Sequence, residues 1–110
     1  MDISFDDNNL KKYANDDRLA ERKLGKREAA LYKQRLDDLT AAQTLEDVRY
    51  LPGNYHELVG NRKGQWACSL VHPYRLIFEP HENPIPTNED GQYLWIQIKG
   101  VEIIEIEDYH

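Results

Sequence analysis

The chain has 110 residues, of which 40% are hydrophobic and 31% charged, and its formal net charge is −6 at pH 7. A chain of this length is expected to form one domain, residues 1–110, that buries roughly two thirds of the surface exposed by the unfolded chain. Its apolar stretches are too short to cross a membrane, and its first residues lack the basic and apolar regions of a secretory signal. The single Cys68 cannot form an internal disulfide and is read as a small buried strand residue, so we expect a cytoplasmic protein.

The acidity is concentrated toward the C-terminal end of the chain. Residues 1–39 hold nine basic and nine acidic side chains, residues 40–78 hold four and three, and residues 79–110 hold one and eight. A local basic surface is therefore compatible with an acidic protein. The overall acidity nevertheless argues against strong, salt-sensitive binding of free nucleic acid.

The first half of the chain predicts a short strand followed by helices. Residues 2–5 alternate in polarity as a strand does, whereas leucines and alanines between residues 24 and 42 recur at helical spacing among charged residues. Gly25 is expected to divide the helical region, and Pro52-Gly53 to end it. Side chains that suit helix N-caps precede the expected helices: Asn8 or Asn9, Asp16 or Asp17, and Thr44 in a capping-box-like segment.

From residue 55 onward the pattern changes to short strands rich in aromatic and β-branched residues. The expected strands are Tyr55–Val59, Trp66–Val71, Tyr74–Glu79, Leu94–Lys99 and Val101–Glu107. Residues 80–93 predict a mobile loop, and Gly100 predicts a bulge or bend. Within the last strand, strict alternation assigns Val101, Ile103 and Glu105 to one face and Glu102, Ile104 and Ile106 to the other. Helices followed by an antiparallel meander indicate the α+β class.

Two histidines are candidates for acid–base chemistry. His56 lies near the start of an expected strand, where a histidine is more often a surface residue, but its unperturbed pKa of about 6.5 suits proton transfer at neutral pH. His110 follows Asp108 and Tyr109 in a terminal segment that in most proteins is frayed. If the strand persists, Asp108 and His110 point to one face and Tyr109 to the other, and the carboxylate favours the imidazolium.

Three basic residues are candidates for holding a phosphate group. Arg75 alternates with apolar neighbours, and Arg62-Lys63 lies between two glycines in a turn; both patterns also occur in ordinary surface strands and hairpins. A guanidinium binds phosphate oxygens with two parallel hydrogen bonds, which favours the functional interpretation. The four histidines lack metal-ligand spacing, and no nucleotide-binding or serine-hydrolase motif occurs, so no metal or cofactor is expected.

In this order, these residues resemble the HigB toxins of the RelE/ParE superfamily, which belong to type II toxin–antitoxin systems. The resemblance spans nearly the whole chain: Leu39-x-Ala41-Ala42, Leu45-Glu46-Asp47, Leu51-Pro52-Gly53, His56-Glu57-Leu58-x-Gly60-x-Arg62-Lys63-Gly64-x-Trp66, Tyr74-Arg75-Leu76-Ile77-Phe78 and Asp108-Tyr109-His110. It implies a RelE-like fold, with N-terminal helices packed on a curved antiparallel sheet. It also implies ribosome-dependent, metal-independent cleavage of mRNA, a HigA-like helix-turn-helix antitoxin, and operator DNA bound through the toxin–antitoxin pair.

Carried onto this sequence, the resemblance implies an active site formed by His56, Asp108, Tyr109 and His110. The two histidines would divide the proton transfers, with neither assigned as the base, and Arg75, Arg62 and Lys63 would bind the substrate. These three cations are expected to form an exposed strip that the antitoxin covers. The acidic loop 80–93 and the net charge of −6 depart from the basic character of ribosome-acting members. Two alternatives stay open: a non-catalytic inhibitor of DNA gyrase like ParE, and a degenerate toxin retained as an antitoxin-binding or co-repressor module.

Overall fold

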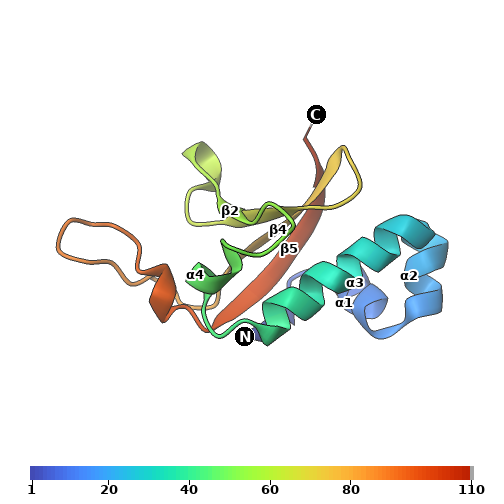
Figure 1. The fold of residues 1–110 in the computed structure, drawn as a ribbon, viewed down its shortest axis with the longest axis horizontal. Helices are drawn as coiled ribbons and strands as arrows, with labels where there is room; N and C mark the ends of the chain where they lie inside the picture. Colours follow the sequence, from blue (N-terminus) through green and yellow to red (C-terminus); the bar gives the residue numbers. More distant parts are fainter. Residues whose placement is uncertain (110) are drawn as a thin grey trace.

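The computed structural model describes residues 1–109 and contains a five-stranded sheet with helices packed on one of its faces (Figure 1). The strand order is β1-β5-β4-β3-β2. The strands are β1 (Asp2–Phe5), β2 (His56–Glu57), β3 (Trp66–Ser69), β4 (Tyr74–Pro80) and β5 (Gly100–Asp108). The helices are α1 (Asn8–Asn15), α2 (Asp17–Leu24), α3 (Lys26–Ala41) and α4 (Leu45–Val48), with two 3-10 turns, η1 (Gly60–Arg62) and η2 (Trp95–Gln97). The predicted α+β class is confirmed.

The sheet is mixed rather than wholly antiparallel. Strands β2 to β5 pair antiparallel in the predicted meander, but β1 lies parallel to β5, with Asp2 opposite Gly100 and Phe5 opposite Ile103. The parallel pairing follows from the chain path, because α1 to α4 and the meander separate β1 from β5 and let β1 join the free edge of the sheet. This edge is far from β2, where the candidate site begins.

The helices cover the sheet with a narrow apolar stripe. Three residues at helical spacing on α3 are buried against the sheet: Tyr32, Leu36 and Leu39. The Tyr32 hydroxyl donates a hydrogen bond to the Leu10 carbonyl of α1 at 2.8 Å. The sheet contributes the alternate residues of its three central strands to the same core: Trp66, Cys68, Leu76, Phe78, Val101 and Ile103. Away from the core the helices carry exposed charged residues, which on α2 are Asp17, Arg18, Glu21, Arg22 and Lys23. The helical face of the sheet is therefore fully occupied by packing.

Helix boundaries follow the expected capping chemistry with one change. Asp7, rather than Asn8 or Asn9, caps α1 by accepting hydrogen bonds from the backbone of Asn9 and Leu10. Asp16 caps α2, and Gly25, at φ 90°, separates α2 from α3. Thr44 and Asp47 form the capping box at the start of α4. Each of these breaks was visible in the sequence because caps and glycines act locally.

The predicted strand Leu94–Lys99 is wrong, because this segment forms the turn η2. Trp95 and Ile98 are both buried and lie three residues apart, a spacing that a turn directs to one side and a strand would direct to opposite sides. Trp95 packs edge-on against Trp66 with ring centroids 5.5 Å apart, and the Ile98 carbonyl accepts from the Leu45 amide. Packing against the core and α4 thus overrides the local strand propensity.

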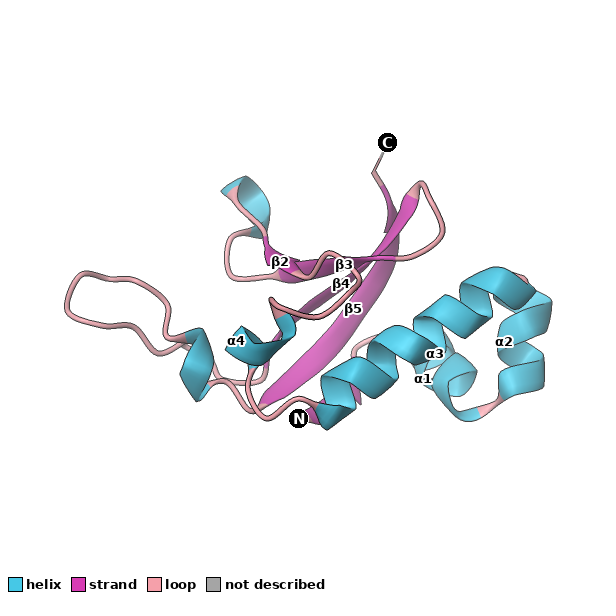
Figure 2. Cartoon of the chain, in the orientation of Figure 1, coloured by secondary structure: helices cyan, strands magenta, loops and turns pink. Residues whose placement is uncertain are grey.

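Residues 81–94 form a long loop that projects from the sheet and contains no strand of the main sheet (Figure 2). A bridge between Thr87 and Tyr93 closes its base, and the Asn88 side chain accepts from the Asp90 and Gln92 amides at its tip. The expected loop is therefore present, with its own hydrogen bonds. Within residues 1–109, no helix has both the length and the apolar character needed to span a membrane.

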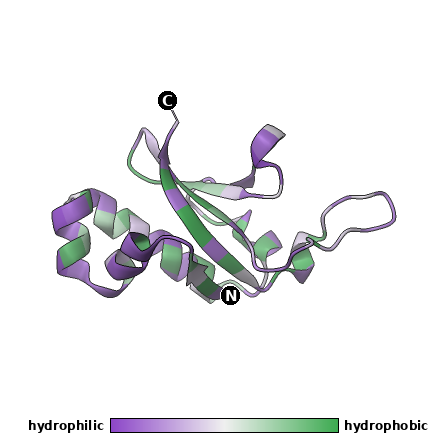
Figure 3. Ribbon diagram, turned by 180° about the vertical axis from the view of Figure 1, so that it is seen from behind, coloured by the Kyte–Doolittle hydropathy of each residue, from purple (hydrophilic) through white to green (hydrophobic). Residues whose placement is uncertain are grey.

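Strand β5 contains a bulge that decides which carboxylates face outward. Phe78 of β4 pairs with Ile103, whereas the adjacent Ile77 pairs with Glu105, so Ile104 is an extra residue without a partner in the register. The predicted alternation is consequently wrong beyond Ile103. Because Ile77 and Phe78 point to opposite faces of β4, their partners Glu105 and Ile103 do so as well. Figure 3 shows the hydrophobic and hydrophilic residues that follow one another along β5. The expected bulge at Gly100 is likewise displaced to Ile104.

Candidate functional site

The candidate site lies on the face of the sheet that the helices do not cover, here called the outer face. Residues paired directly across antiparallel strands share a face, so the register places His56, Ala67, Ile77 and Glu105 in one row across β2, β3, β4 and β5. Two residues further along β4 and β5, Arg75 pairs with Glu107 on that same face. Candidate residues that are distant in sequence are thus brought onto one surface.

His56 is held at the start of β2 by a tight turn. Its Nδ1 lies 2.7 Å from the carbonyl oxygen of Asn54, and Asn54 and Gly53 both have positive φ, at 56° and 120°. A carbonyl oxygen only accepts hydrogen bonds, so Nδ1 carries a proton and donates it. In the neutral imidazole this leaves Nε2 with a free lone pair, as a general base requires.

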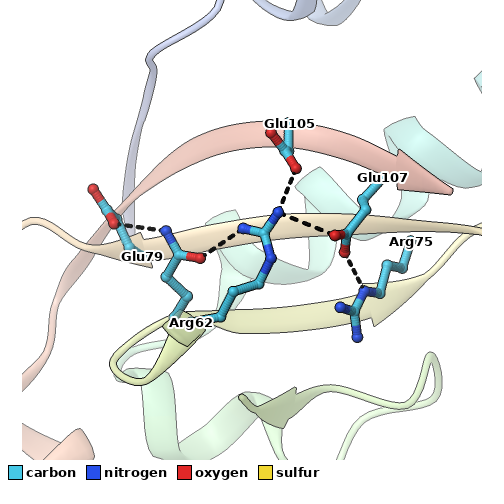
Figure 4. A network of polar contacts seen from close by, with 6 residues as sticks. Arg62, Arg75, Glu79, Glu105 and Glu107 are labelled. Carbon is cyan, nitrogen blue, oxygen red and sulfur yellow. Dashed lines mark hydrogen bonds and ion pairs between the residues drawn. The ribbon is translucent and has the colours of Figure 1, made fainter. Parts of the chain in front are cut away.

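Arg62 reaches from η1 over the outer face and donates to three side chains there. One guanidinium nitrogen donates to Gln65 at 2.9 Å, and the other donates to Glu105 at 2.6 Å and to Glu107 at 3.0 Å (Figure 4). Arg75 of β4 donates its Nε to the second oxygen of Glu107 at 2.7 Å. Glu107 therefore bridges the two arginines.

Glu107 is ionised in this arrangement. Partial burial by itself would raise its pKa, but the hydrogen bond and charge of Arg75, followed by those of Arg62, outweigh burial and lower the pKa below its ordinary value of 4.5. A carboxylate with a lowered pKa is a weak base, so Glu107 is suited to holding the guanidinium groups rather than to removing protons.

Tyr109 stacks on the other side of Arg75. The guanidinium carbon lies 4.3 Å from the ring centroid, and the Tyr109 amide donates to the Pro73 carbonyl. Tyr109 as a whole is 51% exposed. The contact with the aromatic ring orients the planar guanidinium of Arg75. The side of the Tyr109 ring that faces away from Arg75 remains open to a ligand.

The predicted exposed cationic strip is wrong for two of its three members. The Arg62 and Arg75 side chains retain only 27% and 17% exposure and are neutralised by Glu105 and Glu107. Lys63 lies apart from them, 5.7 Å from the Tyr93 ring centroid at the base of the projecting loop. The reason is the bulge in β5, which turns two carboxylates toward the arginines.

An open cleft of about 590 Å³ lies beside these arginines. Its lining comes from the β2–β3 connection and from β4 and β5: Leu58, Val59, Asn61, Arg62, Gln65, Arg75 and Glu107. His56 lies on the same face as this cleft without being part of its lining. The cleft is large enough for a phosphodiester with a flanking ribose, and Glu105 and Glu107 neutralise the charge of its two arginines.

The two remaining predicted residues are placed differently. Asp108 ends β5 opposite Tyr74 and alternates with Glu107, so it lies at the edge of the face opposite to the arginines. His110 lies outside the described residues. Residues 1–109 therefore bring together His56, Arg62, Arg75 and Tyr109 on the outer face, but not Asp108 or Lys63.

Sequence reasoning missed Glu105 and Glu107 as parts of the site. The available signal was the pair Ile103-Ile104, which interrupts an otherwise regular alternation of apolar residues and glutamates. Two consecutive apolar residues inside an alternating strand indicate a bulge, and the glutamates on either side then share one face. Cys68 is not part of the site: it is buried in β3, and burial raises the pKa of its thiol to about 12.

The comparisons with known proteins agree with this architecture. Residues 3–90 match the family model of the HigB-like toxin, described as the RelE-like toxin of the type II toxin–antitoxin system HigB. Over 80 residues the chain is 36% identical to Toxin HigB-1 of Vibrio cholerae, a match covering 72% of this chain and 83% of that toxin. A YoeB/ParE toxin from Agrobacterium tumefaciens has a similar structure, with a TM-score of 0.50 and 12% identity over 100% of both chains. That likeness concerns the fold alone and confirms the predicted RelE-like architecture.

Proposed function

The chain belongs to the HigB-like family of RelE-like toxins of type II toxin–antitoxin systems, and we propose that it inhibits translation by cleaving mRNA on the ribosome. A toxin of such a system has a cognate antitoxin, which we propose is a HigA-like helix-turn-helix protein that recruits the pair to operator DNA. We further propose that the toxin acts in the cytoplasm, without a metal ion.

The observation that carries the enzymatic proposal is the shared outer face of the sheet. His56 there has an Nε2 lone pair fixed by the Nδ1 contact to Asn54, and Arg62 and Arg75 flank the neighbouring cleft. Cleavage of an RNA phosphodiester by its own 2′-hydroxyl needs a proton acceptor and a positive charge next to the phosphate. Both kinds of group face the same side of the protein.

In the proposed reaction, a base removes the proton of the 2′-hydroxyl while its oxygen attacks phosphorus. The bond from phosphorus to the 5′ oxygen breaks, and an acid protonates that leaving oxygen. We assign the two proton transfers to His56 and His110 without ordering them, the phosphate contacts to Arg75 and Arg62, and a stacking contact with a base to Tyr109. Asp108 would act through His110 rather than at the phosphate, and Lys63 would contact the RNA further along its backbone.

The test compares His56→Ala with His72→Ala, because His72 is an exposed histidine in the β3–β4 turn. We expect wild type and His72→Ala to arrest growth and to cleave mRNA on programmed ribosomes. His56→Ala should lose about 10²–10⁴-fold in cleavage rate, the typical contribution of one proton-transfer group. An equally active, folded His56→Ala variant would reject the assigned site.

A second candidate function is an antitoxin-binding or co-repressor module without cleavage activity. It is favoured by the ion pairs that occupy Arg62 and Arg75 and by the net charge of −6. Expression of the wild-type chain separates the possibilities. Arrest of protein synthesis supports the nuclease, arrest of DNA replication with intact translation supports a gyrase inhibitor, and no arrest with antitoxin binding retained supports the module.

A further inference from the structure

We propose that Glu107, assisted by Glu105, acts as an internal competitor of the RNA backbone and thereby limits how tightly the outer face binds a polyanion. The inference rests on the proposed function, because it takes the ligand of Arg62 and Arg75 to be RNA phosphate. It assigns to the two glutamates a role in setting affinity that is separate from the proton transfers.

The geometry of Glu107 is that of a bound anion. Its two carboxylate oxygens lie 3.0 Å from Arg62 and 2.7 Å from Arg75, so one planar group spans both guanidinium groups. A phosphate group likewise presents several oxygens, which accept charge-assisted hydrogen bonds from arginine donors. Carboxylate and phosphate therefore require the same donors.

Several donors of Arg62 and Arg75 are already committed to side chains of the protein itself. Arg62 gives one nitrogen to Gln65 and the other to Glu105 and Glu107, and Arg75 commits its Nε to Glu107 (Figure 4). The surrounding charge adds to this effect, because Glu79 accepts from Gln65 and Glu102 lies opposite Glu79 on the adjoining strand. A phosphate that takes up the Nε of Arg75, or the Arg62 nitrogen shared by Glu105 and Glu107, must displace Glu107 while it is repelled by the neighbouring carboxylates.

The chain provides a matched control for this idea. Glu102 and Glu107 lie on the same strand and the same face, on opposite sides of the bulge, and lose the same unit charge on conversion to glutamine. Within residues 1–109, Arg62 and Arg75 make ion pairs with Glu105 and Glu107 but not with Glu102. Glu102→Gln therefore reports the effect of net charge alone, and Glu107→Gln reports the release of the arginines.

The experiment measures binding of a short fluorescent oligouridylate to the purified chain over a series of salt concentrations. We expect Glu107→Gln to bind about tenfold tighter than Glu102→Gln, since two partly exposed ion pairs are removed from competition. The released arginines should also make the dependence of log Kobs on log salt steeper by about 0.7 for each new phosphate contact. Glu105→Gln, which frees only part of Arg62, should lie between the two.

The gain must depend on the arginines themselves. Adding Arg75→Gln to Glu107→Gln should cancel most of the increase in affinity and return the salt slope toward the wild-type value. Equal affinities and slopes for Glu107→Gln and Glu102→Gln would overturn the inference. If Glu107→Gln fails to fold by circular dichroism, the same comparison between Glu105→Gln and Glu102→Gln decides the matter.

The proposed function and this inference fail separately. Tighter oligouridylate binding by Glu107→Gln with no mRNA cleavage by any variant would reject the nuclease and keep the competitor. Ribosome-dependent cleavage by the wild type, with equal oligouridylate binding by Glu107→Gln and Glu102→Gln, would support the nuclease and reject the competitor.

Discussion

Replacing Gly53 by alanine should destabilise the link between α3 and the strand that carries His56. Gly53 has φ 120°, and its carbonyl accepts from the Ser69 amide, which fixes the turn beside β3. A Cβ built at Gly53 would lie 2.9 Å from both the Nε and the Cζ of Arg35. The guanidinium would have to move, although its Nε donates to the Ser69 carbonyl at 2.7 Å.

The magnitude follows from these two contributions. An L residue in the left-handed region costs about 1–2 kcal/mol. A hydrogen bond from a charged donor contributes about 1.5–3 kcal/mol, which partial exposure of Arg35 reduces to about 1–2 kcal/mol. We therefore expect Gly53→Ala to lower the free energy of unfolding by about 3 kcal/mol. With a urea dependence of about 2 kcal/mol/M, the unfolding midpoint falls by about 1.5 M.

Gly91→Ala is the control for this prediction. Gly91 lies at the tip of the projecting loop with φ 78°, and a Cβ there would have no atom within 4 Å. Only the backbone contribution applies, so its midpoint should fall by about half as much. In an Arg35→Ala background, Gly53→Ala should cost no more than Gly91→Ala. The reasoning is refuted if the two glycine variants are equally stable, or if Gly53→Ala costs the same with and without Arg35.

Three further outcomes are expected. Because the pKa of Glu107 is lowered from 4.5 in the folded state, its ion pairs stabilise the fold above that pH and are lost as the pH falls through the folded-state pKa. The urea midpoint of the wild type should therefore decline below about pH 4.5, and that of Glu107→Gln should decline less steeply. Cys68 is buried, and burial raises the pKa of its thiol to about 12, so it should resist thiol labelling near neutral pH until urea unfolds the chain. Rapid labelling of the folded protein would contradict the buried position of Cys68. A double-mutant cycle of Tyr109→Ala and Arg75→Ala should give a coupling free energy of about 0.5–1 kcal/mol for this partly exposed cation–π pair, and additive effects would show that the stack contributes nothing.

Much of the fold was predictable because its signals are local. The Gly25 break, the Asp16 cap and the Thr44 capping box each depend on a few adjacent residues, and all three form as the sequence predicts. Leu94–Lys99 was mispredicted because its strand-forming residues make core contacts that require a turn, and contacts with distant residues leave no local pattern. The parallel pairing of β1 is a property of the chain path and was equally hidden.

The candidate site was predictable by residue type and only partly by arrangement. The sequence identified His56, Arg62, Arg75 and Tyr109, which share the outer face, because proton-transfer groups and fixed cations are recognisable by their chemistry. It missed the neutralisation of the arginines, since this depends on one unpaired residue in β5. Strict alternation directed Glu105 into the core, whereas the register directs it toward Arg62. The assignments of His110 and Asp108 remain predictions for the activity assays.

The unpaired Ile104 has a consequence for how this chain is compared with its relatives. Removing Ile104 would leave Glu102, Glu105 and Glu107 on one side and Ile103 and Ile106 on the other, in uninterrupted alternation and with unchanged partners on β4. A deletion within the strand outside the Ile103-Ile104 pair would shift the register and invert the side chains that follow it. Position 104 is therefore where a length difference of one residue is structurally neutral, and an alignment of HigB-like chains through β5 should open its gap there.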